Sequence, residues 1–505
     1  MKGASARAVA GLLVVALASW SMHAAGGQQS QSADVQLQLA TQLMEDGRYA
    51  EALEAYQGAL TVAGPEALPL ARAGFVQAAL RTAQFEAARR SAAMLAEESP
   101  LHADAIALHG DALWASGLFE EAEARYDRAL QLDRESARAR HGVARSLAAR
   151  NRLDAALTEA TTALDRDPRN IDLHYTLGTI QERLRQFDAA AASFSNFVNL
   201  LPNRDRSDRA DWARSEIRYL RSFGQRTPLQ MDAGADEQVH TIDFRLLNDK
   251  IIVRARVNGS ALQDFVVDTG AESTILSGSL ARRVGVTPVT FTLSAGVGDV
   301  GIRGLQLARI DSLELGTIRI RNVPCLIKDP PLRNLPIEEA EALSPLALGF
   351  SMTIDFTTRK LTLARRLPEE TADFALPLRM HRLPMVRGLI DGAHPASFVV
   401  DTGGEQISIS QATAEMLGRP EPQPRIPAKV FGSSGWDPDA FLMPGVNLAF
   451  EDLRYDNFTV VVLNLHTPSA LLGFQLGGIV GHRFLRNYRV SIDLDRSVLR
   501  LKRLT

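Results

Sequence analysis

One six-residue motif, Phe-Val-Val-Asp-Thr-Gly, occurs twice in this chain, and each copy contains an aspartate that could take part in catalysis. The copies span 265–270 and 398–403, so Asp268 and Asp401 are 133 residues apart. One Asp-Thr-Gly tripeptide arises by chance in roughly one chain in ten of this length. Two copies, each behind the same three apolar residues, do not arise that way. The second half of the chain is therefore predicted to contain two related halves.

Two aspartates brought together at the tips of buried strands could hydrolyse a peptide bond without a metal ion or a covalent intermediate. Carboxyl groups in contact cannot both ionise readily, so they share a proton and titrate as a pair. The ionised one can act as general base on a water molecule, while the protonated one donates to the substrate carbonyl. The rest of each motif suits this geometry. Gly270 and Gly403 would let the backbones approach, and the hydroxyls of Thr269 and Thr402 could tie the two loops together.

These motifs resemble those of the retropepsin-like and pepsin-like aspartic peptidases, and the resemblance extends over 241–505. In that family a second motif, two apolar residues and a glycine before a short helix, packs under the catalytic loop. Ile479-Val480-Gly481 fits this motif in the second half, and Ala342-Leu343-Ser344 fits it in the first half with a serine in place of the glycine. An alternative alignment on Ala347-Leu348-Gly349 leaves no room for the helix, so the first alignment is preferred.

The resemblance implies an all-β, bilobal aspartic-peptidase fold with a first lobe at 241–366 and a second lobe at 376–505. A typical retropepsin lobe is half a site that must dimerise. Here the two linked lobes would form one active site within the chain, with Asp268 and Asp401 as the catalytic pair. The resemblance implies no metal ion and no cofactor.

The residue after each motif bears on activity. Ala271 follows the first motif, as in retroviral members, whereas Gly404 follows the second, where alanine, serine or threonine is usual. The missing side chain at Gly404 could loosen the loop or shift the acidity of Asp401. Together with the serine at Ser344, this departure makes reduced activity plausible, although both aspartates are present.

Family members also cover the cleft with β-hairpin flaps, and each half contains a glycine-rich candidate. The first is Gly296-Val297-Gly298 within 296–301, and the second is Gly432-Ser433-Ser434. Closed flaps would exclude water and hold an extended peptide by backbone pairing. The run 296–301 also matches a dinucleotide-binding pattern, but 305–310 after it has strand character rather than the helix that such a loop requires.

Other catalytic patterns fit less well. The run 432–435 is one residue short of a Gly-x-Ser-x-Gly elbow and lacks the strand-to-helix context of a serine nucleophile. The ten histidines show no His-Glu-x-x-His spacing, so a zinc peptidase is disfavoured. Asp355 and Asp493 each follow an isoleucine at the end of a predicted strand, where a turn role is commoner than catalysis.

A second periodicity organises the first half of the chain. An aromatic residue or leucine followed by acidic and small residues recurs at spacings of 36, 34, 34 and 34, at Tyr49, Phe85, Phe119, Leu153 and Phe187. This period is typical of stacked antiparallel helix pairs and resembles tetratricopeptide repeats. We therefore expect a helical solenoid at 33–223, closed by a charged amphipathic helix at 206–223 and joined to the first lobe by a polar linker at 224–240. Its concave face could hold a peptide or a protein partner, or the array could be a spacer.

The N-terminus has the features of a secretory signal peptide at 1–25, because Lys2 and Arg7 precede an apolar run too short to span a bilayer. A periplasmic or secreted bacterial protein is therefore expected, or one tethered to the inner membrane if the segment is not cleaved. The only cysteine, Cys325, excludes an intramolecular disulfide. A net charge of −3 gives no electrostatic case for binding nucleic acid.

These features favour an aspartic-type endopeptidase whose helical repeats recruit or orient protein substrates or partners. Two alternatives remain open from the sequence. The β lobes could clamp extended peptides without cutting them, or the repeats could act as a periplasmic assembly scaffold with the lobes as accessories.

Overall fold

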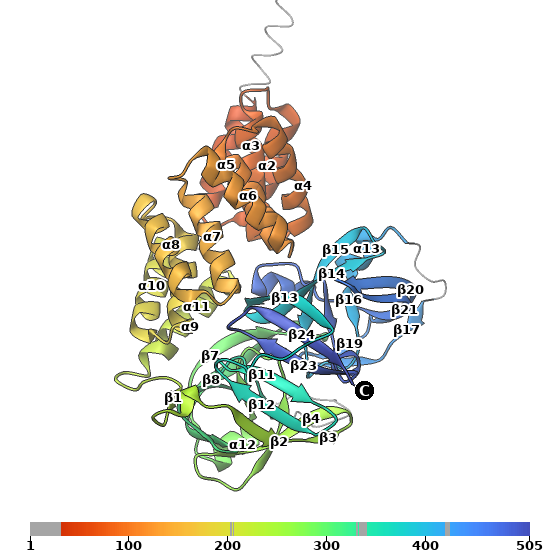
Figure 1. The fold of residues 1–505 in the computed structure, drawn as a ribbon. Helices are drawn as coiled ribbons and strands as arrows, with labels where there is room; N and C mark the ends of the chain where they lie inside the picture. The colour runs from red at the N-terminus through yellow and green to blue at the C-terminus, as the bar shows by residue number, and fades with distance from the viewer. Residues whose placement is uncertain are drawn as a thin grey trace, which may run out of the picture.

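The computed structural model describes residues 32–202, 205, 207–329, 332, 341–419 and 425–504. Figure 1 shows a helical array, coloured red to yellow, stacked on a β-rich part, coloured green to blue. The expected fold class, a helical repeat domain followed by a bilobal β domain, is confirmed. No described helix has the length and apolar character needed to cross a membrane. The expected signal peptide at 1–25 lies outside the described residues.

The helical array consists of antiparallel helix pairs, the first of which begins with helical residues 32–45. The other helices are α2 (Tyr49–Val62), α3 (Leu68–Arg81), α4 (Phe85–Glu98), α5 (Ala103–Ala115), α6 (Phe119–Leu132), α7 (Ala137–Ala149), α8 (Leu153–Arg166), α9 (Ile171–Arg183), α10 (Phe187–Leu200) and α11 (Asp208–Arg221). Each of the five periodic anchor residues is the first residue of the second helix in its pair. The 34-residue period in the sequence therefore corresponds to one helix pair.

Aromatic rings and glycines explain how neighbouring helices approach so closely. Tyr126 of α6 is fully buried, and its ring lies between Gly110 of α5 and Gly142 of α7. A Cβ atom at Gly110 would lie 2.5 Å from this ring, and one at Gly142 would lie 2.3 Å from it. Phe194 of α10 covers Gly178 of α9 in the same way. Because the apolar faces are completed only by adjacent helices, the array is stable as a stack.

The first lobe is built around a nine-stranded sheet in the order β1-β9-β6-β10-β5-β4-β8-β7, with β3 paired to β4. Its strands are β1 (Gln230–Met231), β3 (Arg245–Leu247), β4 (Lys250–Val257), β5 (Gln263–Val267), β6 (Thr274–Ser277), β7 (Pro288–Ala295), β8 (Ile302–Leu315), β9 (Ile318–Lys328) and β10 (Ala342–Leu343). The short helix α12 (Gly278–Arg283) follows β6. Strand β1 and the 3-10 turn η1 (Ala235–Glu237) lie in the segment expected as a linker, so part of that segment joins this sheet.

The second lobe contributes most of a thirteen-stranded sheet in the order β17-β20-β21-β16-β22-β15-β14-β13-β24-β23-β11-β12-β2. The strands from this lobe are β13 (Phe374–His381), β14 (Leu383–Ile390), β15 (His394–Val400), β16 (Ser408–Ser410), β17 (Ile426–Pro427), β20 (Phe441–Phe450), β21 (Leu453–Leu463), β22 (Gly478–Val480), β23 (Tyr488–Asp493) and β24 (Val498–Arg503). The hairpin β18 (Val430–Gly432) and β19 (Gly435–Asp437) stands apart, and the short helices are α13 (Gln411–Met416), α14 (His466–Leu472) and α15 (His482–Leu485).

The two lobes are joined by strand pairing. Strands β2 (His240–Asp243), β11 (Ser351–Asp355) and β12 (Lys360–Ala364) come from the first lobe, and β11 pairs antiparallel with β23 of the second. At the centre of this pairing the hydroxyls of Thr353 and Ser491 lie 2.9 Å apart. Buried side chains from both lobes form one core, so the lobes are held in a fixed relation.

Asp355 and Asp493 occupy equivalent positions at the ends of β11 and β23. The carboxylate of Asp355 accepts from the amides of Thr357 and Thr358, and that of Asp493 accepts from the amide of Arg496. Both therefore stabilise turns, as their sequence context predicted.

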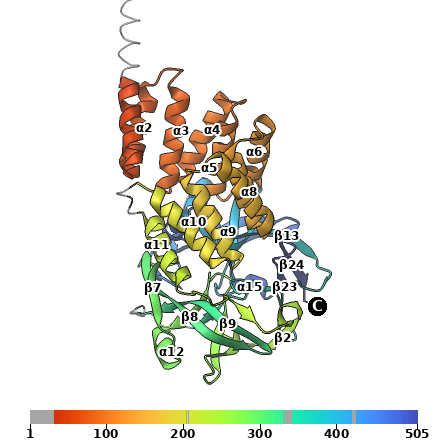
Figure 2. The same cartoon turned by 90° about the vertical axis from the view of Figure 1, so that its left-hand side faces the viewer.

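The repeat array packs against both lobes. The ring of Phe119 in α6 lies 5.8 Å from that of Phe474, and the amide of Gln475 donates to the carbonyl of Ala115 at 2.7 Å. On the other lobe the Tyr219 hydroxyl of α11 donates to the carbonyl of Ala308 at 3.0 Å. Figure 2 shows α11 beside β7 at this junction. The closing helix thus covers the first lobe instead of ending the solenoid in solvent.

Candidate active site

Asp268 and Asp401 lie at the tips of two equivalent buried strands. Strand β5 ends at Val267 and β15 ends at Val400, so each aspartate follows directly. In each lobe a short strand lies beside the aspartate's strand: the Asp268 amide donates to Leu343 at 2.9 Å, and the Asp401 amide donates to Val480 at 3.0 Å. Each aspartate-bearing loop is therefore fixed by a strand that comes from much later in the chain.

This pairing decides between the two first-lobe alignments. Strand β10 runs parallel to β5 and antiparallel to β6, as β22 does with β15 and β16. Ser344 consequently occupies the position of Gly481. A Cβ atom at Gly481 would lie 2.5 Å from the backbone of Glu405, whereas the Ser344 side chain is accommodated and buried. The first lobe has a turn at 345–349 in place of the helix α15, so only the second lobe has the complete motif.

Thr269 and Thr402 connect the two loops through four buried hydrogen bonds. The Thr269 hydroxyl donates to the carbonyl of Val400 at 2.6 Å, and the Thr402 hydroxyl donates to the carbonyl of Val267 at 2.7 Å. Each hydroxyl also accepts from the other threonine's amide, at 3.1 and 3.0 Å. The loops therefore have a reciprocal, nearly symmetric attachment that fixes the separation of the two aspartates.

The glycines of the motifs let each carboxyl group lie against the opposite loop. A Cβ atom at Gly270 would lie 2.6 Å from Cγ of Asp401, and one at Gly403 would lie 2.6 Å from Cγ of Asp268. The Gly270 amide donates to Oδ1 of Asp268 at 2.9 Å, and the Gly403 amide donates to Oδ1 of Asp401 at 2.8 Å. A side chain at either glycine would separate the carboxyl groups.

Asp401 influences the protonation of Asp268. Burial is the largest cause that raises the pKa of Asp268, to about 7, and the charge of Asp401 and a hydrogen bond with it act in the same direction. The Gly270 amide and the charge of Lys250 oppose this increase in the pKa. A raised pKa produced by burial and a like charge is the expected signature of two carboxyl groups that share one proton.

The residues after the motifs differ in the space available to them. Ala271 is buried, and its methyl group is part of the packed loop. At Gly404 a Cβ atom would lie 2.7 Å from Oδ2 of Asp401 and 3.1 Å from its Cγ. An alanine here would therefore require the Asp401 carboxyl group to move from its position in this structure.

The two flap candidates meet above the aspartates. The first tip, 296–301, joins β7 to β8, and the second, Ser433 and Ser434, joins β18 to β19. The Ser434 amide donates to the carbonyl of Val297 at 3.0 Å, the Val300 amide donates to the carbonyl of Ser434 at 2.9 Å, and the Gly296 amide donates to the Ser434 hydroxyl at 3.0 Å.

Close packing accompanies these bonds. A Cβ atom at Gly298 would lie 2.2 Å from the Ser434 backbone, and one at Gly432 would lie 2.4 Å from the carbonyl oxygen of Val297. The segment 305–310 that follows the first tip belongs to β8, so this loop does not lead into a helix as a dinucleotide-binding loop would.

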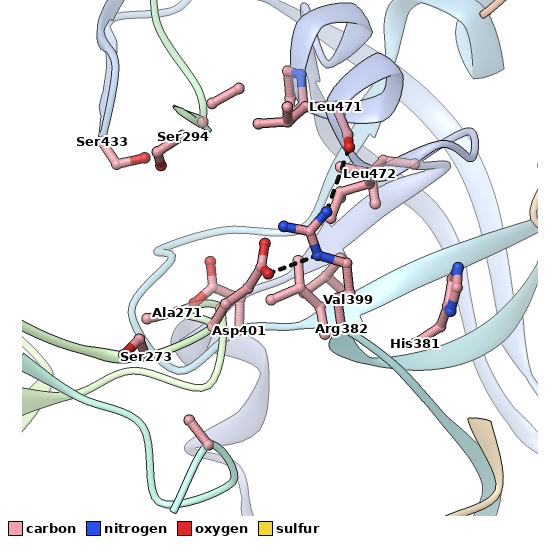
Figure 3. A pocket seen from close by; sticks show the side chains of 18 of the residues that line it. Ala271, Ser273, Ser294, His381, Arg382, Val399, Asp401, Ser433, Leu471 and Leu472 are labelled. Carbon is pink, nitrogen blue, oxygen red and sulfur yellow. Dashed lines mark hydrogen bonds and ion pairs between the residues drawn. The ribbon is translucent and has the colours of Figure 1, made fainter. Parts of the chain in front are cut away.

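A continuous cavity of about 1990 Å³ extends from the aspartates to the inner face of the repeat array. Its walls include both aspartates, Ser294 of β7 and Ser433 of the second tip, together with repeat residues such as Tyr175 and Trp212. Figure 3 shows Asp401 and Arg382 on the floor of this space, with Ser294 and Ser433 opposite. The cleft and the concave face of the repeats therefore form one surface.

Sequence reasoning missed two charged residues at this junction. The guanidinium of Arg382, just after β13, forms an ion pair with the carboxylate of Glu272 at 2.7 Å and donates to the carbonyl of Leu471. Glu272 follows Ala271 directly, and Glu405 occupies the same position after the second motif. This repeated glutamate was a detectable signal, whereas nothing in the local sequence of Arg382 marks it. Among the described residues, no group of three His, Cys, Asp or Glu side chains is arranged to hold a metal ion.

Comparisons with known proteins match the two parts of the chain to two different families. Segments 253–352 and 386–476 match the aspartyl protease family, and segments 107–171 and 144–204 match the tetratricopeptide repeat. No curated protein matches the chain.

Similar solved structures include a thermophilic tetratricopeptide-repeat protein of Thermus thermophilus, with 18% identity over 37% of this chain and 98% of its own, at a TM-score of 0.31. An aspartic proteinase from Irpex lacteus has 11% identity over 53% of this chain and 98% of its own, at a TM-score of 0.35. By the family matches, the C-terminal half of the chain is similar to aspartyl proteases and the N-terminal part to tetratricopeptide repeats.

Proposed function

We propose that this protein is an aspartic-type endopeptidase with a single two-aspartate site inside one chain. The observation that carries this proposal is the pair of catalytic loops, which the hydroxyls of Thr269 and Thr402 hold together so that each carboxyl group lies against the other loop. Such a pair is suited to activating water between two carboxyl groups.

The raised pKa of Asp268 supports a pair that holds one proton near neutral and acidic pH, and we place this proton on Asp268. In the proposed reaction Asp268 donates its proton to the carbonyl oxygen of the scissile bond. Asp401 accepts a proton from the attacking water, whose oxygen bonds to the carbonyl carbon. Asp401 then gives its proton to the amide nitrogen as the carbon–nitrogen bond breaks, and one hydroxyl of the tetrahedral gem-diol returns its proton to Asp268 as the carbonyl group re-forms. Carboxylic acid and amine products leave, and the pair again holds one proton.

In this proposal the flaps and the repeats help to bind the substrate. Opening the contact between Val297 and Ser434 would admit an extended chain, and closing the tips over it would exclude water. The continuous cavity supports a role for the repeats in receiving the flanking part of a protein substrate. A protein partner of the repeat array fits the same surface.

The decisive experiment compares the mature protein with Asp268→Asn and Asp401→Asn variants. Unfolded protein substrates would be incubated from about pH 4 to 8, and products identified by mass spectrometry. We expect the parent protein to cut and each folded variant to be inactive. If only one substitution abolishes cutting, the lobes act separately. If the parent binds peptides without cutting them at any pH, the domain is a peptide clamp and the proposal fails.

Export is part of the same proposal, on the strength of the leader-like segment at 1–25. We expect the protein in the periplasm or culture medium of its bacterium, with a new N-terminus near Ala25. Mass spectrometry of the N-terminal peptide distinguishes a cleaved leader from an uncleaved inner-membrane tether.

A further inference from the structure

Three glutamates from different parts of the chain line the cavity where the repeats meet the catalytic cleft. Glu182 belongs to α9, Glu216 belongs to α11, and Glu272 follows the first catalytic loop. Arg382 of the second lobe lies among them. The charges of Arg382 and Glu272 act on both Glu182 and Glu216.

The positive groups at this place are already engaged. Arg382 pairs with Glu272 at 2.7 Å, and its guanidinium lies 5.7 Å from the ring centre of Trp212. Arg183 donates to the carbonyl of Ala148 at 2.6 Å, to the side chain of Asn151 at 2.9 Å and to the carbonyl of Met380 at 3.3 Å. These contacts fix both guanidinium groups in the wall.

Glu182 and Glu216 lack such partners. Within the part of the chain that the structure describes, neither carboxyl group has a hydrogen bond or an ion pair. Glu216 is only 4% exposed, yet it lines the cavity. Burying a carboxyl group without a partner is costly, so such a group inside a binding cavity indicates that a ligand supplies the missing contact.

We infer that Glu182 and Glu216 form a subsite for a cationic side chain, lysine or arginine, of the polypeptide bound in the cleft. The inference rests on the proposed function, since it assumes that a polypeptide occupies this cavity. Glu272 and Arg382 neutralise each other at the edge of the subsite, which leaves the two unpaired carboxyl groups for the ligand. The half-buried rings of Trp212 and Tyr175 in the same wall offer apolar surface to the methylene stem of such a side chain.

The pKa values of the two glutamates predict that a cation binding at this subsite causes a measurable release of protons. Burial is the largest cause that raises the pKa of Glu182, to about 7, and burial followed by the charge of Glu182 raises that of Glu216 well above its usual range. The charge of Glu272 raises both pKa values, while Arg382 lowers both and Arg183 lowers that of Glu182. A bound cation favours the ionised forms, so binding at pH 7 must release protons.

The test measures peptide binding to the full-length Asp401→Asn protein, which retains the cavity. The probes are acetylated and amidated decapeptides in which a single lysine is moved along the chain, each paired with a norleucine version. Blocked termini exclude binding through an N-terminal amine. Calorimetry in two buffers of different ionisation enthalpy reports the proton release.

We expect lysine to strengthen binding at least about tenfold at one position, with release of a proton that the norleucine peptide does not cause. Glu216→Gln and Glu182→Gln, each added to Asp401→Asn, should abolish both effects, so that the lysine and norleucine peptides bind equally to each variant. Asp211→Asn is the matched control, because Asp211 lies on the same helix with an exposed side chain paired to Arg214. It should behave as the parent.

Equal binding of lysine and norleucine peptides at every position, or a lysine preference that survives both Glu→Gln changes, would overturn the inference. This result is separable from the catalytic proposal. If the parent protein never cuts but shows the glutamate-dependent lysine preference, the subsite inference stands and the peptidase proposal fails. If the protein cuts peptides but shows no lysine preference, the peptidase proposal stands and the subsite inference fails.

Discussion

The hydroxyl of Thr269 donates to the carbonyl of Val400, while that of Thr402 donates to the carbonyl of Val267, so each lobe holds the end of the strand that leads to the other lobe's aspartate. The bonds are buried and reciprocal, and their lengths differ by only about a tenth of an ångström. The position of each aspartate is consequently set by the opposite lobe as much as by its own.

Thr402→Val should test this attachment. The substitution removes a buried hydroxyl and leaves the Val267 carbonyl and the Thr269 amide without partners, which costs about 1–3 kcal/mol of unfolding free energy for each group. Urea denaturation measures this loss. Thr402→Ser keeps the hydroxyl and should retain peptidase activity that the valine variant lacks. Equal activity of the two variants would contradict the role assigned to the hydroxyl.

Activity should fall as the pH rises through about 7. The raised pKa of Asp268 means that its proton, the one donated to the substrate, is lost in that range. The rate constant kcat/KM should therefore decline about tenfold per pH unit above this value. A pH profile on an uncharged peptide substrate measures it, and a profile flat up to about pH 9 would count against Asp268 as the acid.

The raised pKa of Asp268 also predicts how the free energy of unfolding changes with pH. Because the folded-state pKa of Asp268 is above its unfolded value, its contribution is complete below about pH 4 and is lost as the pH rises to about 7. Asp268→Asn removes this dependence. The unfolding free energy of the variant, relative to the parent, should increase between about pH 4 and pH 8 in parallel urea titrations.

Gly404→Ala should reduce activity, although alanine is usual at this position in the family that the motif resembles. Its Cβ would meet Oδ2 of Asp401 at 2.7 Å and displace the carboxyl group. A displacement of this kind lowers kcat by as much as about a hundredfold. Ala271→Gly at the equivalent position adds no atom and serves as the control. Undiminished kcat in Gly404→Ala would show that the carboxyl group has room to move.

Gly298→Ala should impair flap closure. Gly298 has φ = +139°, and its Cβ would overlap the Ser434 backbone at 2.2 Å. Gly301 also has a positive φ, of +67°, but no atom lies within 4 Å of its Cβ position. Peptide cleavage kinetics should show a higher KM for Gly298→Ala than for Gly301→Ala. Equal KM values would mean that the contact between the tips does not affect substrate binding.

The predictions that succeeded came from signals local in the chain. The 34-residue period placed the first residue of five helices, because each helix pair repeats the same pattern of small and aromatic side chains. The duplicated motif placed Asp268 and Asp401 at equivalent strand ends. The first-lobe alignment on Ala342 was also correct, although the short helix expected after it is a turn.

Other features depended on contacts between distant segments. The sequence marked Gly404 and Ser344 as departures of unknown effect, and only the structure shows that Gly404 lies against a carboxyl group while Ser344 has room for its hydroxymethyl group. The amphipathic pattern predicted a helix that closes the solenoid, and only the structure shows that Tyr219 binds this helix to the first lobe. Amphipathicity shows that a face is buried and does not show what covers it.

By itself the sequence determined the two architectures and placed the two aspartates and the two glycine-rich hairpin tips, because these follow from periodicity and motif spacing along the chain. Only the tertiary structure brought the concave face of the repeats to the cleft and gathered Glu182, Glu216 and Arg382 in one wall. These residues come from separate helices and a separate lobe, with no shared period or motif. Their proximity depends on how the repeat array docks on the lobes, and docking depends on shape and packing over many residues rather than on any local pattern.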